Sequence, residues 1–252
     1  MSRRPRILAV DAGNSRVKWA LYEYAAVVGE GWFATGDPDR LEAQWESLAV
    51  PDSAVIANVA GDAVGEHLEH GCERWSLSPI WVRSQPKQCG VTNNYNNPEQ
   101  LGPDRWAALI GAHALSPGNR VVVCMGTATT IDALTIRGEF LGGMILPGIE
   151  MMHTMLASKT ARLGPEQGEV VSFPHSTREA ITTGAVRATW GAIEQLSAEM
   201  QQAGHDNVTV VCTGGAAPAF LSRCKCQMVL CDRLVLQGLL RIGESMMGQS
   251  GS

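Results

Sequence analysis

Short apolar runs alternate with longer amphipathic runs along the chain. The apolar runs at residues 6–10, 17–24 and 27–33 have the length of strands, whereas the segment 39–49 carries its apolar residues at helical spacing. Further strands are predicted at 54–59, 79–83, 121–125 and 208–212, and further helices at 62–73, from 103, after Ser176 and at 232–247. Strands that alternate with helices indicate an α/β layer architecture.

The pattern divides near the middle of the chain. Residues 85–102 are rich in Asn, Pro and Gly, which predicts a loop. Pro103 suits the first turn of the helix that follows, and this helix is expected to end near Pro117. We therefore predict an N-terminal domain of residues 1–117 and a C-terminal domain of residues 118–252.

The two halves share a weak internal similarity. Residues 9–21 can be laid over residues 123–134 so that Gly13 falls on Gly126, and in both an apolar strand enters a turn of small residues and leaves as another strand. The identities are few. Two such units facing each other would form a two-sided phosphate clamp.

Composition narrows the possible partners. The chain of 252 residues has 45% hydrophobic residues and a net charge of −5, which is ordinary for a globular protein and disfavours non-specific nucleic-acid binding. No apolar run is long enough to span a bilayer, and the four apolar residues at 7–10 are too few for a signal peptide. The odd number of cysteines, 7, argues against a disulfide framework. We expect a cytoplasmic protein with no membrane or nucleic-acid partner.

The first candidate binding site follows the first strand and comprises Asp11, Ala12, Gly13, Asn14, Ser15, Arg16, Val17 and Lys18. Gly13 allows phosphate oxygens to approach the backbone, and Asn14 and Ser15 supply small hydrogen-bonding groups. Asp11 could hold Mg²⁺, through water, and Lys18 adds a positive charge. A plain hairpin turn is the alternative, because Asp, Gly and Asn are common in turns.

Two further runs carry candidate chemistry. Residues 126–132, with Thr127 among three threonines, follow a buried strand and could donate several hydrogen bonds to a polyphosphate, although threonine also favours strands in general. Gly102, Pro103, Asp104 and Arg105 stand at the start of a helix. A carboxylate in a first turn is favoured by the helix dipole, so capping is the plainer explanation for Asp104. A Gly-rich run at 142–148 gives backbone freedom where a ligand or a second backbone comes close.

Taken in series, the runs D-x-G-N-[ST]-x-x-K, G-x-D-R, G-T-A-T-T-x-D and G-G-x-I-x-P-G are specific. Their order and positions resemble those of the type III pantothenate kinases, from Ile7 to about Leu240. They fit neither the Walker A pattern nor the protein-kinase signatures. The resemblance implies an α/β fold of duplicated ribonuclease-H-like, actin-like ATPase domains with mixed sheets flanked by helices and an ATP cleft between the domains. It also implies phosphorylation of pantothenate by ATP to 4'-phosphopantothenate, the first step of coenzyme A biosynthesis, by a homodimer.

The resemblance assigns roles to single residues. Residues 11–18 match the family's first phosphate motif, and Thr127 matches a second ATP contact. Gly102, Pro103, Asp104 and Arg105 match its pantothenate-binding stretch, with Asp104 as the catalytic base. Tyr95 matches a pantothenate-contacting tyrosine, and Thr177 matches a substrate-contacting threonine.

One position departs from the family. Cys124 stands where the family has an acid that helps to bind a monovalent cation, and a thiol is a poor ligand for a hard ion such as K⁺ or NH₄⁺. Either the enzyme works without that cation or another oxygen holds it. Two other interpretations stay open: a non-catalytic transcription accessory factor of the same family, and a kinase of the same superfamily that acts on another hydroxyl or carboxyl substrate.

Overall fold

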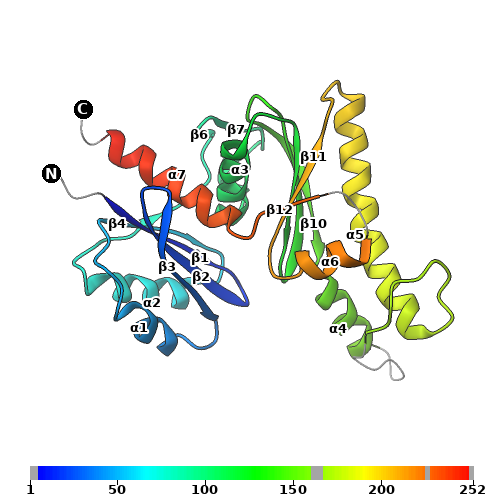
Figure 1. Cartoon of the computed structure of the whole chain (residues 1–252), viewed down its shortest axis with the longest axis horizontal. Helices are drawn as coiled ribbons and strands as arrows, with labels where there is room; N and C mark the ends of the chain where they lie inside the picture. Colours follow the sequence, from blue (N-terminus) through cyan, green and yellow to red (C-terminus); the bar gives the residue numbers. More distant parts are fainter. Residues whose placement is uncertain (1–4, 160–166, 225–227, 250–252) are drawn as a thin grey trace. The chain divides into compact units, whose positions relative to one another are not determined.

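The computed structural model describes residues 5–159, 167–224 and 228–249 (Figure 1). By its internal contacts the chain forms two compact units. The first contains the chain up to Ser116 together with the segment that begins at Arg233, and the second runs from Pro117 to Asp232. No helix within the described ranges is both long and apolar enough to cross a bilayer.

The first unit is built on a mixed sheet in the strand order β3-β2-β1-β4-β5. Its first three strands form an antiparallel meander, β4 then pairs in parallel with β1, and β5 pairs in parallel with β4. Their bounds are β1 (Arg6–Ala12), β2 (Arg16–Glu23), β3 (Ala26–Ala34), β4 (Ser53–Asn58) and β5 (Ile80–Trp81). The sequence predicted each of these strands to within a few residues.

Helices cover both faces of this sheet. Leu8, Val10 and Ile56 point to one face and pack with Leu41 and Leu68 of the helices α1 (Asp39–Trp45) and α2 (Asp62–Glu73). On the other face lies α7 (Leu234–Gln249), whose Gly243 fits against side chains of Ile7 and Val55.

The helices α3 (Pro103–Leu115) and α7 pack closely against each other (Figure 1). Gly111 lies against the backbone at Leu234, and Gly238 lies against the backbone of Ala107, so side chains at these two glycines would collide with the neighbouring helix. This contact explains why the segment from Arg233 groups with the first unit, whereas the sequence analysis assigned it to the second domain. Glycines that allow helices to approach closely have no distinctive signature in a single sequence.

The expected loop at 85–102 contains short elements of its own: β6 (Lys87–Gln88), β7 (Val91–Asn93) and the 3₁₀ turn η1 (Pro98–Gln100). The side chain of Asn97 caps η1 by accepting a hydrogen bond from the backbone N–H of Glu99, and Asn93 donates to the carbonyl of Pro98 at 3.1 Å. These asparagines therefore hold the segment in a defined conformation.

The second unit has a sheet with the strand order β12-β11-β8-β9-β10. The strands β8, β9 and β10 form an antiparallel meander, β11 pairs in parallel with β8, and β12 pairs in parallel with β11. Their bounds are β8 (Arg120–Met125), β9 (Ala128–Leu134), β10 (Glu139–Pro147), β11 (Thr209–Thr213) and β12 (Val229–Leu230).

Three helices cover one face of this second sheet: α4 (Ile149–Lys159), α5 (Thr177–Gln202) and α6 (Ala217–Cys224). Ile193 and Phe220 pack there on Val121, Val123 and Ile131. The predicted capping box at the start of α5 is confirmed, because Ser176 accepts from the Glu179 N–H at 3.2 Å while the Glu179 carboxylate accepts from the Ser176 N–H at 3.1 Å.

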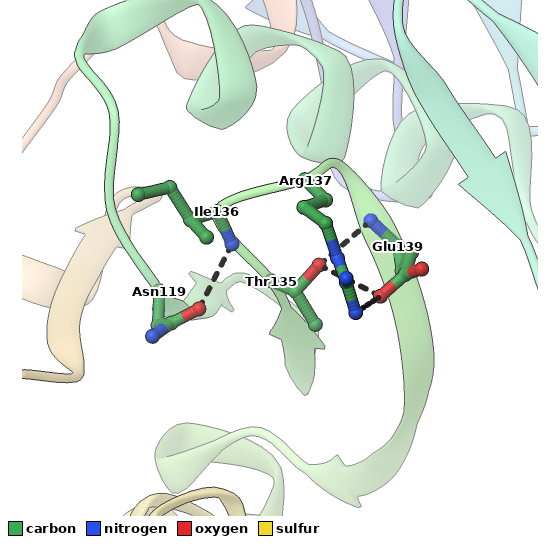
Figure 2. Close-up of polar contacts among 5 residues, drawn as sticks. All are labelled: Asn119, Thr135, Ile136, Arg137 and Glu139. Atoms are coloured by element: carbon green, nitrogen blue, oxygen red, sulfur yellow. Dashed lines mark hydrogen bonds and ion pairs between the residues drawn. The ribbon is translucent and has the colours of Figure 1, made fainter. Parts of the chain in front are cut away.

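A small polar network fixes the hairpin between β9 and β10 (Figure 2). Asn119 accepts a hydrogen bond from the Ile136 N–H at 2.9 Å, and Thr135 exchanges hydrogen bonds with Glu139, whose carboxylate Arg137 also approaches at 3.5 Å. This hairpin is at the end of the strands opposite to the turn at residues 126–127. The network holds the adjoining ends of β9 and β10 together at the hairpin.

The two units repeat one topology. Each begins with a three-stranded antiparallel meander. A fourth strand then pairs in parallel with the first, and a fifth pairs in parallel with the fourth. The strands β1-β2-β3-β4-β5 therefore correspond to β8-β9-β10-β11-β12. The weak internal similarity that placed Gly13 on Gly126 therefore reflects a structural duplication.

Candidate active site

The turn between β1 and β2 carries the first candidate phosphate motif. The Gly13 N–H donates to the carbonyl of Arg16 at 3.0 Å and closes a tight turn whose tip, Asn14 and Ser15, is exposed. A Cβ at position 13 would lie 3.2 Å from that same carbonyl oxygen, so a side chain there would be crowded by the turn itself. The tip thus presents small polar groups and backbone to an incoming ligand.

Asp11 and Lys18 are cross-strand neighbours at the base of this turn. The half-buried Asp11 has its pKa raised to about 7, first by burial and second by the negative charge of Asp104, while Lys18 acts in the opposite direction. The first turn of α3 therefore lies near the exit of β1. The charges of Asp104 and Lys18, two predicted site residues, thus both act on a third, Asp11.

Asp104 stands in the first turn of α3, after Pro103 at the first helical position and Gly102 at the N-cap. A Cβ at position 102 would lie 2.6 Å from a carboxylate oxygen of Asp104. Glycine at 102 therefore leaves the space that the Asp104 carboxylate occupies. The N-cap residue is a glycine and makes no side-chain cap hydrogen bond.

Arg105 and Tyr95 meet beside this helix start. Arg105 is 5% exposed, its guanidinium donates to the Tyr95 hydroxyl at 3.2 Å, and it lies 5.8 Å from the centre of the Tyr95 ring. The Tyr95 N–H in turn donates to the Asn93 side chain at 3.1 Å. The structure thus places together two of the side chains that the resemblance assigned to the substrate.

In the second unit, the turn between β8 and β9 repeats this design. The Gly126 N–H donates to the carbonyl of Ala128 at 3.0 Å, and Gly126 and Thr127 are exposed. Gly148 lies directly against this turn and donates its N–H to the Thr127 carbonyl at 2.9 Å, where no side chain at 148 would fit. The Gly-rich run was expected to allow close approach of either a ligand or a second backbone. At Gly148 the neighbour is a second backbone, that of Gly126 and Thr127.

Cys124 lies half-buried in β8, paired with Thr130 on β9 and with Thr213 on β11. The Thr130 hydroxyl is buried and has no hydrogen-bond partner among the described residues. The surroundings of Cys124 thus supply hydroxyl groups, whereas the residue itself supplies a thiol.

The remaining predicted residue, Thr177, is the exposed first residue of α5 in the second unit.

Two residues beside the first turn were not among the predicted site residues: Trp32 in β3 and Thr35 directly after it. The Arg16 guanidinium lies 4.5 Å from the centre of the Trp32 ring, and the Thr35 hydroxyl donates to the Gly13 carbonyl at 2.7 Å. The predicted meander could have indicated these two residues, because the pairing of β2 with β3 brings their side chains to the turn between β1 and β2.

A cavity of about 550 Å³ opens in the first unit near the start of α3. Of the predicted substrate residues only Pro103 lines it. Four carboxylates, from Asp62, Glu66, Glu69 and Glu99, and one guanidinium, from Arg83, also line it. This predominantly acidic lining disfavours a carboxylate-bearing substrate. We therefore place the candidate site at Asp11, Asp104 and Arg105 and not in this cavity.

The donor set fits Mg²⁺ bound mainly through ATP and water. Mg²⁺ in kinases keeps several waters and uses one or two carboxylates together with substrate phosphates. Asp11 supplies such a carboxylate, and its raised pKa shows that its negative charge lacks sufficient compensation from the protein alone. The described residues contain no group of three or more His, Cys, Asp or Glu that could form a complete protein cage.

Comparison with known proteins agrees with this geometry. A family model described as type III pantothenate kinase matches residues 7–199. A type III pantothenate kinase of Nitrosospira multiformis is 42% identical over 240 residues, covering 95% of this chain and 92% of the relative. The chain belongs to the type III pantothenate kinase family. It is therefore a kinase, with ATP and pantothenate as the substrates of its family and a requirement for a divalent metal such as Mg²⁺.

A second relative, the type III pantothenate kinase of Methylibium petroleiphilum, is 42% identical over 248 residues, which cover 94% of this chain and 97% of the relative. Among solved structures, one whose name assigns it to the Baf family of transcriptional activators, from Campylobacter jejuni, has a TM-score of 0.65 at 22% identity and covers 96% of this chain and 99% of its own. MreB5 of Spiroplasma citri bound to ADP has a TM-score of 0.55 at 8% identity, with complete coverage of both chains. These likenesses establish the duplicated ribonuclease-H-like, actin-like fold.

Proposed function

We propose that the chain transfers the γ-phosphoryl group of ATP to the primary hydroxyl of pantothenate, with Asp104 as the general base. The observation that carries this proposal is the approach of Asp104 to Asp11 at the exit of β1, beside the paired side chains of Tyr95 and Arg105. It combines a carboxylate that can accept a proton, an acid suited to a metal–nucleotide complex and a buried cation in one unit. None of the three would be needed by an inert scaffold.

The nucleotide is assigned to the two turns. In the first, residues 11–18 would contact the phosphates through the exposed tip at Asn14 and Ser15, with Lys18 adding positive charge. In the second, Thr127 is exposed at the corresponding place and would supply a further hydrogen bond. This assignment is supported by the shared design of the turns, each closed by a glycine N–H.

Asp11 would hold Mg²⁺, through water, together with oxygens of ATP. When bound, the ion supplies neutralisation of the phosphate charge that develops during transfer. Asp11 contributes orientation of that complex, and Lys18 compensates part of the remaining charge.

In the transfer itself, the pantothenate oxygen forms a bond to the γ-phosphorus while the bond from the γ-phosphorus to the β,γ-bridging oxygen breaks, and ADP leaves. The transition state of such reactions is loose, so positioning dominates. Asp104 first orients the hydroxyl by accepting its hydrogen bond and takes its proton late in the reaction, because a carboxylate is a weak base towards an alcohol. Arg105, held by Tyr95, binds the substrate, and Thr177 is a further substrate contact.

We also assign a homodimer to the functional protein. Large apolar side chains are exposed in the second unit, with Ile145, Met155, Leu156 and Phe173 between 44% and 78% exposed. Large exposed apolar side chains occur at association surfaces, and the resemblance to the type III pantothenate kinases implies a homodimer. Light scattering at several protein concentrations tests this assignment, and a strictly monomeric protein that is fully active would contradict it.

The test of the function is ADP release with ATP and Mg²⁺, with and without pantothenate. We expect release to depend on pantothenate. Asp104→Asn should lower turnover by at least about a hundredfold, the low end of general-base contributions, while the protein still folds. Asp206→Asn, an exposed loop acid, is the matched control. Wild-type turnover in Asp104→Asn would remove this residue from the mechanism. ADP release that responds to another hydroxyl or carboxyl compound would instead favour a different substrate, and none at all would favour the non-catalytic accessory factor.

A further inference from the structure

In both units, the residue that follows the third strand of the meander donates a hydrogen bond to the candidate phosphate-binding turn. In the first unit this residue is Thr35, directly after β3, and its N–H donates to the Ser15 carbonyl at 3.1 Å. In the second it is Gly148, directly after β10, and its N–H donates to the Thr127 carbonyl at 2.9 Å. Ser15 and Thr127 each stand immediately before the first residue of the next strand, so the two hydrogen bonds are structural equivalents.

Thr35 adds a second hydrogen bond that Gly148 lacks. Its hydroxyl donates to the carbonyl of Gly13 at 2.7 Å, so one residue holds the carbonyls of both Gly13 and Ser15. In a trans peptide the C=O and the following N–H point in opposite directions. The Gly13 carbonyl, which would repel a phosphate, points towards Thr35. The Asn14 N–H therefore points to the opposite side.

The remaining polar group of Gly13 is also committed, because its N–H donates to Arg16. Both peptide groups of this glycine are thus fixed within the protein. Successive backbone N–H groups held in such turns form concave anion-binding sites. The hydroxyl of Thr35 binds the carbonyl of the peptide between Gly13 and Asn14.

We propose that Thr35 is a positioning residue for the phosphates of ATP: its hydroxyl orients the Gly13–Asn14 peptide so that the Asn14 N–H faces the nucleotide. This inference rests on the proposed assignment of residues 11–18 to ATP. It adds a residue outside that run, from the exit of a neighbouring strand. The role is indirect, since Thr35 itself acts on the turn and not on the substrate.

Thr35→Val tests the hydroxyl alone, because valine has nearly the same shape and keeps the backbone N–H that binds Ser15. Loss of one hydrogen bond to a partly buried carbonyl should raise the KM for ATP about five- to tenfold. The KM for pantothenate should stay within about twofold, since the Thr35 hydroxyl contacts only the ATP turn. Thr35→Ser restores a hydroxyl and should restore the KM for ATP.

Thr189→Val is the matched control, because the Thr189 hydroxyl also donates to a backbone carbonyl, that of Ala185, at 3.0 Å within α5. This variant should leave the KM for ATP unchanged. The proposal is overturned if Thr35→Val keeps the wild-type KM for ATP, if both KM values rise together with a fall in Tm, or if Thr35→Ser behaves like Thr35→Val.

Calorimetric titration with Mg²⁺ and the non-hydrolysable analogue AMPPNP separates this inference from the proposed function. A weaker affinity in Thr35→Val, with wild-type affinity in Thr35→Ser, supports the positioning role even if pantothenate is not the substrate. Equal affinity in wild type and Thr35→Val overturns the positioning role even if the chain phosphorylates pantothenate.

Discussion

The carboxylates of Asp11 and Asp104 lie close enough for the charge of Asp104 to raise the pKa of Asp11, although one ends a strand and the other begins a helix. Two like charges in a partly desolvated place are unfavourable for the fold. Proteins tolerate such arrangements where function requires them. The pair therefore gives both an activity prediction and a stability prediction.

Asp11→Asn should stabilise the ligand-free protein at neutral and alkaline pH while abolishing activity. The pKa of Asp11 is about 7 in the folded protein, against 3.8 for an aspartate exposed to water as in the unfolded chain. Between these two pH values Asp11 is protonated in the folded protein and ionised in the unfolded chain. Stability of the wild type is consequently lost as pH rises from about 4 to 7. The Tm of Asp11→Asn minus that of the wild type should increase from pH 5 to pH 8 and then level off.

Thermal unfolding without nucleotide or Mg²⁺ measures this difference. Asp206→Asn serves as a control, since it removes an exposed carboxylate from a loop and should show no such pH-dependent gain. A Tm difference for Asp11→Asn that is constant or falls from pH 5 to pH 8 would contradict the charge arrangement described above.

Gly102→Ala should displace the Asp104 carboxylate. The new Cβ would lie 2.6 Å from an oxygen of that carboxylate, which can rotate away with little disturbance of the backbone. We expect turnover to fall by about tenfold or more, because a small misplacement of a catalytic group is costly. Loss of the glycine cap should lower stability by no more than about 1 kcal/mol. Steady-state kinetics and denaturant unfolding measure the two effects.

Gly184→Ala is the control for that substitution, because a Cβ at 184 meets no atom within 4 Å. It should leave turnover unchanged. Wild-type turnover in Gly102→Ala would show that Asp104 does not depend on the space at residue 102.

Tyr95→Phe should weaken pantothenate binding without affecting ATP. It removes the oxygen that accepts from Arg105 at 3.2 Å but keeps the aromatic ring beside the guanidinium. Loss of one hydrogen bond to a charged group predicts a rise of about tenfold or more in the KM for pantothenate. The exposed Tyr24 offers a control in Tyr24→Phe. Equal increases in the two KM values of Tyr95→Phe would show that the Tyr95–Arg105 pair does not serve the substrate specifically.

Most of the fold was accessible from the sequence because its strands are continuous apolar runs. The helices α4 and α6 and the strand β10 were not predicted, and in β10 the composition obscures the pattern. The strand β10 contains Gly142 and Gly143, which disfavour strands, and its outer face is apolar, including Leu141 and Ile145. Such a strand lacks the alternation on which strand prediction depends.

Motif order located the candidate site residues, but only the folded chain shows which of them meet. In the first unit the charge of Asp104 acts on Asp11, and Arg105, the next residue, is hydrogen-bonded to Tyr95. Thr35 was missed because a single threonine after a strand carries no signal by itself. Its role follows from a hydrogen bond to Gly13 that depends on the pairing of β2 with β3.

Cys124 predicts how the enzyme responds to monovalent cations. The thiol is a poor ligand for K⁺ and NH₄⁺, so wild-type turnover should change by less than about twofold when K⁺ replaces Na⁺. Cys124→Asp places a carboxylate between Thr130 and Thr213, where the unpaired Thr130 hydroxyl can donate to it. This variant should gain stimulation by K⁺ of at least about threefold, because an oxygen ligand then becomes available. Cys124→Ser, which keeps the size and adds no charge, should behave like the wild type. Strong dependence of the wild type on K⁺ would mean that neighbouring oxygens, such as those of the two threonines, bind the cation without an acid at residue 124.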